Sequence, residues 1–181
     1  FIAIDIASEL VEQIEHLVGE LAEKANLREG DAKMVTPEAM HLTLKFLGEV
    51  SDADVAEVCR VCRDAVIERR RFEIDIEGVG SFGKSPRVVW LGVGRGGEEI
   101  CGLADEIEER LGESGWARDN REFHGHLTLC RVKNFKAGRR LKEVIKDYAD
   151  YFAGSVIVNS VYVYESKLTS SGPIYTVLKK C

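Results

Sequence analysis

The tetrapeptide His41-Leu-Thr-Leu44 returns 85 residues later as His126-Leu-Thr-Leu129, and this repeat is the strongest guide to the fold. Each copy lies in an apolar run typical of a β-strand, residues 40–47 in the first half and residues 125–132 in the second. Side chains at positions i and i+2 of a strand share a face. The histidine and threonine of each copy therefore point to one side, while the leucines can pack in a core on the other. Two such strands facing each other across a cleft would present two imidazoles and two hydroxyls to one ligand.

The segments outside the repeat alternate between helical and strand patterns. Apolar residues at helical spacing predict helices over residues 8–25, 51–66, 98–111 and 137–148. Strand-like runs cover residues 1–6, 72–76, 87–93, 155–164 and 174–178, and a polar loop is expected over residues 112–124. A glycine-rich turn over residues 78–86 predicts an antiparallel hairpin between two of these strands.

Recurring hairpins favour an α+β fold with antiparallel sheets over a doubly wound parallel sheet. Each half also carries one motif strand, then a helix, then further strands, which indicates an internal two-fold repeat. We therefore expect residues 1–181 to form a single domain of two pseudo-symmetric lobes. Each lobe would be an antiparallel sheet with flanking helices, and the lobes would surround a central cleft.

The composition is typical of a globular protein and excludes some classes of partner. Hydrophobic residues make up 45% of the 181 positions, which supports a well-buried core. The formal net charge of −6 argues against a protein that grips a long nucleic acid by counterion release, but a pocket for a single RNA end stays open. No apolar run approaches the ~20 residues needed to span a membrane, and residues 1–6 are too few for the apolar region of a signal peptide. We expect a monomer that does not associate with membranes.

The five cysteines are an odd number at irregular spacing, which favours reduced thiols in a cytoplasmic protein. Two of them, Cys59 and Cys62, form a CxxC pattern inside a predicted helix. We interpret this pattern as two packed thiols, because no second ligand pair accompanies it. A zinc or redox site is the alternative interpretation.

Other patterns compete with the repeat as functional sites. Gly92–Gly97 satisfies G-x-G-x-x-G between a predicted strand and a predicted helix, which is the pattern of a dinucleotide-binding turn. Such a site needs a further strand after the helix, and the polar segment Gly112–Glu122 provides none, so we interpret the glycines as a turn. His124 shares strand parity with His126, so the two could chelate a metal. We interpret His124 as an edge residue of the cleft and His16 as a surface histidine.

The two copies and their surroundings resemble a known family. The chain is similar to the two-histidine phosphoesterases, which carry a pair of His-x-Thr-x motifs. Within them it most resembles the RNA 2′,3′-cyclic phosphodiesterases, also called 2′-5′ RNA ligases. One position departs from that pattern, because Gly125 stands where a proline commonly precedes the second histidine. The segments that carry the resemblance are Phe1–Ile6, His41–Gly48, Gly80–Val93, Phe123–Arg131 and Tyr164–Tyr175.

The resemblance implies a hydrolase that opens a terminal 2′,3′-cyclic phosphate of RNA to a 2′-phosphate, with no metal and no other cofactor. His41 would be the general acid and His126 the general base, an assignment that two chemically equivalent motifs do not make by themselves. Thr43 and Thr128 can donate hydrogen bonds to the non-bridging phosphate oxygens. The same chemistry in reverse would join RNA ends through a 2′-5′ bond without ATP. The expected partners are RNA ends with a 2′,3′-cyclic phosphate, such as tRNA halves, or cyclic nucleotides.

Strand parity also predicts where the side chain five residues beyond each histidine points. Arg131 would point away from the face of His126 if the strand alternated strictly, so it reaches the phosphate only if the strand bends. Its role in binding the phosphate is implied by the resemblance alone. Phe46 shares parity with Leu42, and we expect it in the core rather than against a base.

The alternative to an enzyme is a module that binds a nucleotide or an RNA end without turnover. The two intact motifs speak against this alternative, because a binding module would tolerate the loss of either histidine. Incubation with a cyclic nucleotide discriminates the two classes.

Overall fold

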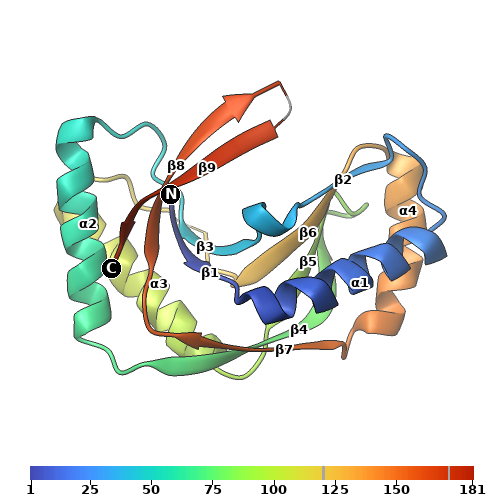
Figure 1. Cartoon of the computed structure of the whole chain (residues 1–181), viewed down its shortest axis with the longest axis horizontal. Coiled ribbons are helices and arrows are strands. Elements are labelled where there is room, and N and C mark those ends of the chain that lie inside the picture. Colours follow the sequence, from blue (N-terminus) through green and yellow to red (C-terminus); the bar gives the residue numbers. More distant parts are fainter. Residues whose placement is uncertain (120, 171) are drawn as a thin grey trace.

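The structure is a computed structural model that describes residues 1–119, 121–170 and 172–181. The described residues form an antiparallel sheet and four α-helices, so the predicted α+β class is confirmed (Figure 1). The helices are α1 (Ser8–Lys24), α2 (Asp52–Ile67), α3 (Gly97–Glu113) and α4 (Phe135–Val144). The strands are β1 (Ile2–Asp5), β2 (Ala32–Met34), β3 (His41–Lys45), β4 (Phe72–Phe82), β5 (Val88–Val93), β6 (His126–Val132), β7 (Phe152–Val158), β8 (Tyr162–Thr169) and β9 (Gly172–Lys180).

The sheet consists of two groups of strands that meet at the motif strands. Its order is β7-β4-β5-β6-β3-β1-β8-β9, with β2 paired to β6. We call β3, β1, β8 and β9 the first lobe, and β6, β5, β4 and β7 the second lobe. The lobes meet where β3 pairs with β6, in a register that places Leu42 opposite Leu127. These leucines occupy equivalent places in the sequence repeat, so the two-fold relation between the lobes passes between them.

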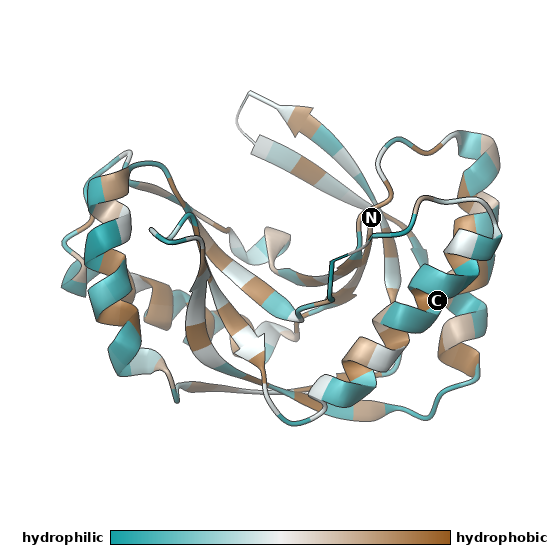
Figure 2. Cartoon of the chain, turned by 180° about the vertical axis from the view of Figure 1, so that it is seen from behind, coloured by the Kyte–Doolittle hydropathy of each residue, from teal (hydrophilic) through white to brown (hydrophobic). Residues whose placement is uncertain are grey.

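The helices lie in two pairs at opposite ends of the sheet (Figure 1). Helix α1 packs against α4 and β7, and α2 packs against α3 and β8. Each helix mixes hydrophobic and hydrophilic residues along its length (Figure 2), as a helix with one buried face must. The Ser51 hydroxyl caps α2 by accepting from the Asp54 N–H, and the Asn134 side chain caps α4 in the same way from Ala137. None of the helices in the described ranges is both long and apolar enough to cross a bilayer.

Several predicted boundaries are wrong. The strand predicted over residues 155–164 is two strands, because β7 pairs with β4 at one end of the sheet while β8 pairs with β1 in the other lobe. One straight strand cannot reach both places. The helix predicted over residues 137–148 ends as α4 at Val144 and continues as a 3₁₀ turn over Ile145–Tyr148. Strand β4 continues into the predicted turn, and β2 was not predicted. The loop predicted over residues 112–124 lies between α3 and β6, with its residue 120 outside the described ranges.

A buried ion pair ties the end of β3 to α3. The Lys45 side chain is buried, and its Nζ lies 2.6 Å from a carboxylate oxygen of Glu108. The same Nζ donates a hydrogen bond to the Ala117 carbonyl at 3.2 Å. Removing one partner of a buried pair leaves the other partner without compensation for its lost hydration.

We expect Lys45→Met to lower the free energy of unfolding by about 2 kcal/mol, because the partly exposed Glu108 loses the buried cation that compensates for its lost hydration. The measurement is urea unfolding followed by circular dichroism. The control is Arg60→Met, which removes an exposed pair with Glu57 on the surface of α2 and should change stability far less. Equal losses in the two variants would show that burial does not strengthen the Lys45 pair.

Candidate active site

Both motif histidines and both motif threonines lie on one face of the sheet. Leu42 and Leu127 are opposite each other in an antiparallel pair, so their side chains share a face, and both are fully buried. The residues on either side of each leucine therefore point to the other face, where all four are partly exposed. We call this surface the motif face. The predicted alternation is confirmed, but the two strands are hydrogen-bonded neighbours rather than strands that face each other.

The register of the two motif strands brings each histidine near the threonine of the other motif. Extending the Leu42–Leu127 pair by one residue places His41 opposite Thr128 and Thr43 opposite His126. Opposite residues in such a pair have Cβ atoms about 5 Å apart. This register would bring the four side chains together as one group of two imidazoles and two hydroxyls.

Strand β3 contains a β-bulge immediately after its motif threonine. Thr43 pairs with Ala3 of β1, whereas Lys45 pairs with Ile2. One step along β1 thus matches two steps along β3, and Leu44 is the extra residue. A bulge of this kind shifts the alternation of side chains by one position.

Strand β6 contains the same irregularity at the equivalent place. Thr128 pairs with Trp90 of β5, whereas Cys130 pairs with Val89, so Leu129 is the extra residue. Both leucines of each tetrapeptide are buried, and so is the residue that follows each tetrapeptide. The bulge is therefore a shared property of the repeat.

The bulges turn Phe46 and Arg131 toward the motif face, which corrects the prediction for Phe46 and meets the condition under which Arg131 would reach a phosphate. The Phe46 side chain is 70% exposed rather than in the core, and its ring centroid lies 6.1 Å from that of Phe1 beside His41. Arg131 is exposed, and its charge lowers the pKa of His41 and of His126. Within the described part of the chain, no carboxylate forms an ion pair with Arg131. Its guanidinium is thus available to an anion held between the histidines.

Each histidine is oriented by a backbone group two residues before it. The Nδ1 of His126 lies 2.7 Å from the carbonyl oxygen of His124. A carbonyl oxygen can only accept, so Nδ1 carries the proton and Nε2 is the nitrogen left for a ligand. His41 forms an equivalent hydrogen bond with the backbone of Ala39.

Burial keeps both imidazoles neutral near pH 7. It lowers the pKa of His41 to about 4, against the opposing effects of the Ala39 hydrogen bond and of the Asp5 carboxylate. Burial also lowers the pKa of His126, and the nearby His124 and Arg131 add to that effect. Desolvation disfavours a charged imidazole, whereas a bound anion favours it. An anion at this face would therefore raise both pKa values.

Aromatic side chains from the far end of the chain surround His41. Its ring centroid lies 4.8 Å from that of Phe1 and 5.1 Å from that of Tyr175, with the tyrosine edge-on. The Tyr164 ring is stacked 6.1 Å away, and its hydroxyl donates a hydrogen bond to Asp5. The hairpin of β8 and β9 supplies both tyrosines and projects from the body of the sheet (Figure 1). No periodicity in the sequence predicted these contacts.

A second aromatic group surrounds His126. The Phe82 ring lies edge-on at 4.9 Å, and the rings of His124 and Trp90 lie at 6.2 Å and 6.4 Å. The indole of Trp90 lies directly over Gly80, where a Cβ atom would come within 2.2 Å of the ring. A glycine is therefore required at this position of β4.

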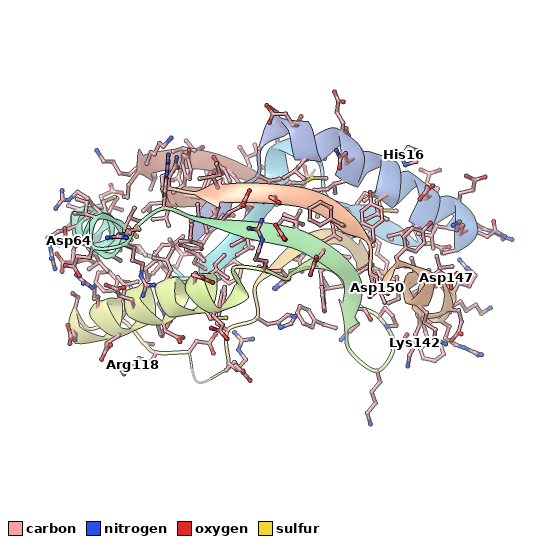
Figure 3. All side chains as sticks on the ribbon, turned by 90° about the horizontal axis from the view of Figure 1, so that it is seen from below. His16, Asp64, Arg118, Lys142, Asp147 and Asp150 are labelled. Atoms are coloured by element: carbon pink, nitrogen blue, oxygen red, sulfur yellow. The ribbon has the colours of Figure 1, made fainter. Side chains whose placement is uncertain are left out.

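The remaining candidate residues lie apart from this chemistry or at its edge. His124 is exposed beside His126, and the described residues contain no group of three or more His, Cys, Asp or Glu side chains that could hold a metal ion. His16 is exposed on the outer surface of α1 (Figure 3), as predicted. Gly92–Gly97 leads from β5 into α3, and β5 pairs antiparallel with β6, whereas a dinucleotide fold needs parallel strands here. The interpretation of these glycines as a turn is confirmed.

Comparison with known proteins identifies the family. The model of the 2′-5′ RNA ligase superfamily matches residues 6–169. A protein of Aeropyrum pernix named RNA 2′,3′-cyclic phosphodiesterase is 40% identical over 148 residues, which cover 81% of this chain and 83% of that protein. A protein of Archaeoglobus fulgidus with the same name is 34% identical over 181 residues, which cover 99% and 97%. The crystal structure of E. coli LigT complexed with 3′-AMP matches with a TM-score of 0.75 and 27% identity, covering 100% of this chain and 95% of that one. The chain therefore belongs to the 2′-5′ RNA ligase superfamily.

Proposed function

We propose that this protein is an RNA 2′,3′-cyclic phosphodiesterase that opens a terminal cyclic phosphate to a 2′-phosphate. The observation that carries the proposal is the placement of two neutral imidazoles and two hydroxyls on a single face, together with a guanidinium that forms no ion pair with a carboxylate of the described residues. Relatives with this name are up to 40% identical to the chain, which supports the same activity. RNA ends that bear a cyclic phosphate, including tRNA halves, are the proposed substrates, together with cyclic nucleotides.

The reaction needs one proton acceptor and one proton donor on opposite sides of phosphorus. His126 Nε2 removes a proton from the attacking water, and its Nδ1 stays bonded to the His124 carbonyl while the charge develops. His41 protonates the departing 3′ oxygen, as the resemblance implies. It must first gain a proton, and the bound phosphate makes this easier by raising its pKa.

The other residues of the motif face stabilise the charge on the phosphate. Thr43 and Thr128 donate hydrogen bonds to the two non-bridging oxygens, and Arg131 provides a positive charge with no competing carboxylate. Acid–base catalysis of this kind uses no metal. Run in reverse, the same arrangement brings an RNA 5′-hydroxyl onto phosphorus and forms a 2′-5′ bond without ATP.

The setting of the protein is part of the proposal. All five cysteines are free, which supports a reducing compartment such as the cytoplasm. We further propose that the monomer is the active form, because each lobe contributes one motif and the site needs no second chain. A binding module without turnover is the alternative, and the tests below separate it from an enzyme.

Alanine at His41 or at His126 should each lower turnover of a 2′,3′-cyclic nucleotide by about 10²–10⁴-fold, the usual contribution of a positioned proton-transfer group. The double variant should lose less than the product of the two losses, because the pair acts as a unit. The assay is chromatography of the products at fixed pH. His16→Ala is the matched control, because it removes an exposed histidine from α1. Near-normal turnover in either motif variant would end the two-histidine mechanism.

The pH dependence of kcat/KM should report the pKa values of the free protein, and that of kcat should report those of its complex with substrate. Because the pKa of His41 is about 4 and that of His126 is lowered, kcat/KM should be bell-shaped, with its maximum below the ordinary histidine pKa of about 6.5. The maximum of kcat should lie at higher pH, because the bound phosphate favours the protonated imidazoles. Arg131→Gln should move the kcat/KM profile to higher pH and raise KM, whereas Arg60→Gln on α2 should do neither. An unmoved profile in Arg131→Gln would remove this guanidinium from the site.

The isomer of the product tests which bond breaks. The 2′ and 3′ oxygens are similar leaving groups, so the one in line with the attacking water decides the outcome. We expect hydrolysis of a 2′,3′-cyclic mononucleotide to give mainly the 2′-phosphate, separated from its isomer by chromatography. Mainly 3′-phosphate would show that the ribose lies the other way round and that the direction taken from the family is wrong for this chain.

A further inference from the structure

Three cysteines lie close together, two of them on α2 and one beside it, and the proposed reaction uses none of them. Cys59 and Cys62 are three residues apart on α2, so they share a side of the helix. Cys181 follows β9, which runs back past α2 (Figure 1). Two backbone hydrogen bonds with Val161, of 2.8 Å and 3.1 Å, hold Cys181 in this position. The backbone of Cys181 is thus held beside the helix by two hydrogen bonds just beyond the paired strands β8 and β9.

The Cys181 sulfur meets the two helix cysteines in different ways. Its Sγ lies 3.5 Å from the carbonyl oxygen of Cys59, so Cys59 meets it with the backbone. The thiol of Cys62 donates a hydrogen bond to the Cys181 sulfur. Cys62 is fully buried, whereas Cys181 is partly exposed. A reagent from solvent therefore reaches Cys181 first, and Cys62 is the thiol behind it.

The electrostatics give the two thiols opposite character. The hydrogen bond from Cys62 lowers the pKa of Cys181 to about 7, with help from the charges of Lys179 and Arg63. The same hydrogen bond and burial raise the pKa of Cys62. A thiolate is the reactive form of cysteine, so Cys181 is the nucleophile of the pair. Burial raises the pKa of Cys101, which leaves that thiol less reactive.

We propose that Cys181 and Cys62 form a dithiol site that hydroperoxides oxidise to a disulfide. The Cys181 thiolate attacks one peroxide oxygen, which forms an S–O bond and breaks the O–O bond. The leaving oxygen takes up a proton as water or an alcohol. Cys62 then attacks the Cys181 sulfur, forming the S–S bond as hydroxide departs and becomes water with the proton of Cys62. Two thiols are oxidised and one hydroperoxide is reduced.

The disulfide would connect α2 to the residue that follows β9, the second strand of the β8–β9 hairpin. That hairpin carries Tyr164 and Tyr175, which pack on His41. The proposal is independent of the proposed function, because it rests on contacts away from the motif face. It pairs Cys62 of the CxxC pattern with a thiol from a distant part of the sequence and not with Cys59.

The test counts free thiols in the full-length protein after oxidation. The reduced protein is treated with hydrogen peroxide, unfolded and alkylated with iodoacetamide, and its intact mass is measured. We expect only three of the five thiols to react, and dithiothreitol should restore all five. In the folded reduced protein at pH 7, Cys181 should be alkylated about tenfold faster than Cys101, because more of it is thiolate. Five reactive thiols after peroxide would overturn the proposal.

Matched variants identify the partner. Cys59→Ser should still lose two thiols to peroxide, whereas Cys62→Ala should lose none to a disulfide and instead yield a Cys181 sulfenic acid that dimedone traps. Cys181→Ser replaces one sulfur atom by oxygen at a partly exposed position, so it should fold. It should abolish the reaction of the site with peroxide. This variant therefore tests the proposal even if the buried Cys62→Ala variant does not fold. A disulfide that persists in Cys62→Ala, or that disappears in Cys59→Ser, would assign the bond to Cys59 and refute the pair.

Discussion

The pairing of Leu42 with Leu127 is the constraint on which the rest of the site depends. These two buried side chains fix the register in which β3 and β6 meet. A shift of one residue would send every histidine and threonine of one strand to the opposite face. Burying the leucines and exposing the histidines are therefore one requirement, and the hydrophobic effect that stabilises the sheet also orients its polar residues.

Much of this arrangement follows from the sequence, because alternation within a strand is a local property. The tetrapeptides, the four helices and the antiparallel hairpin were predictable from spacing alone. The positions of Phe46 and Arg131 were not, because a bulge depends on how the neighbouring strand pairs, and no residue type in the repeat marks it. The split of residues 155–164 into two strands was hidden for a similar reason. Both pieces are apolar, and only the order of strands in the sheet shows that they belong to different lobes.

The two histidines of the site are neutral before a ligand binds. Burial keeps the two imidazoles neutral, and the guanidinium of Arg131 meets no carboxylate in the described chain. The charge of Arg131 acts on both imidazoles, so an arriving phosphate finds a cation and two groups that can change protonation. Elsewhere the chain pairs its charges closely, as Arg95 does with Glu73 and Asp75. Closely paired charges such as those of Arg95 stabilise the fold, whereas the charge of Arg131 can bind an anion.

The order of strands also affects how the chain folds during its synthesis. Strand β1 is made well before β8, yet the two strands pair, and the ring of Tyr175 completes the surroundings of His41. Contacts between residues so distant in sequence form late, because closing a long loop costs conformational entropy before these contacts can stabilise the fold. On a ribosome the second lobe has nearly all its strands before the first lobe can close. A nascent chain thus contains both tetrapeptides before it contains the tyrosines that pack on His41, and the surroundings of that histidine are completed only once β9 has been made.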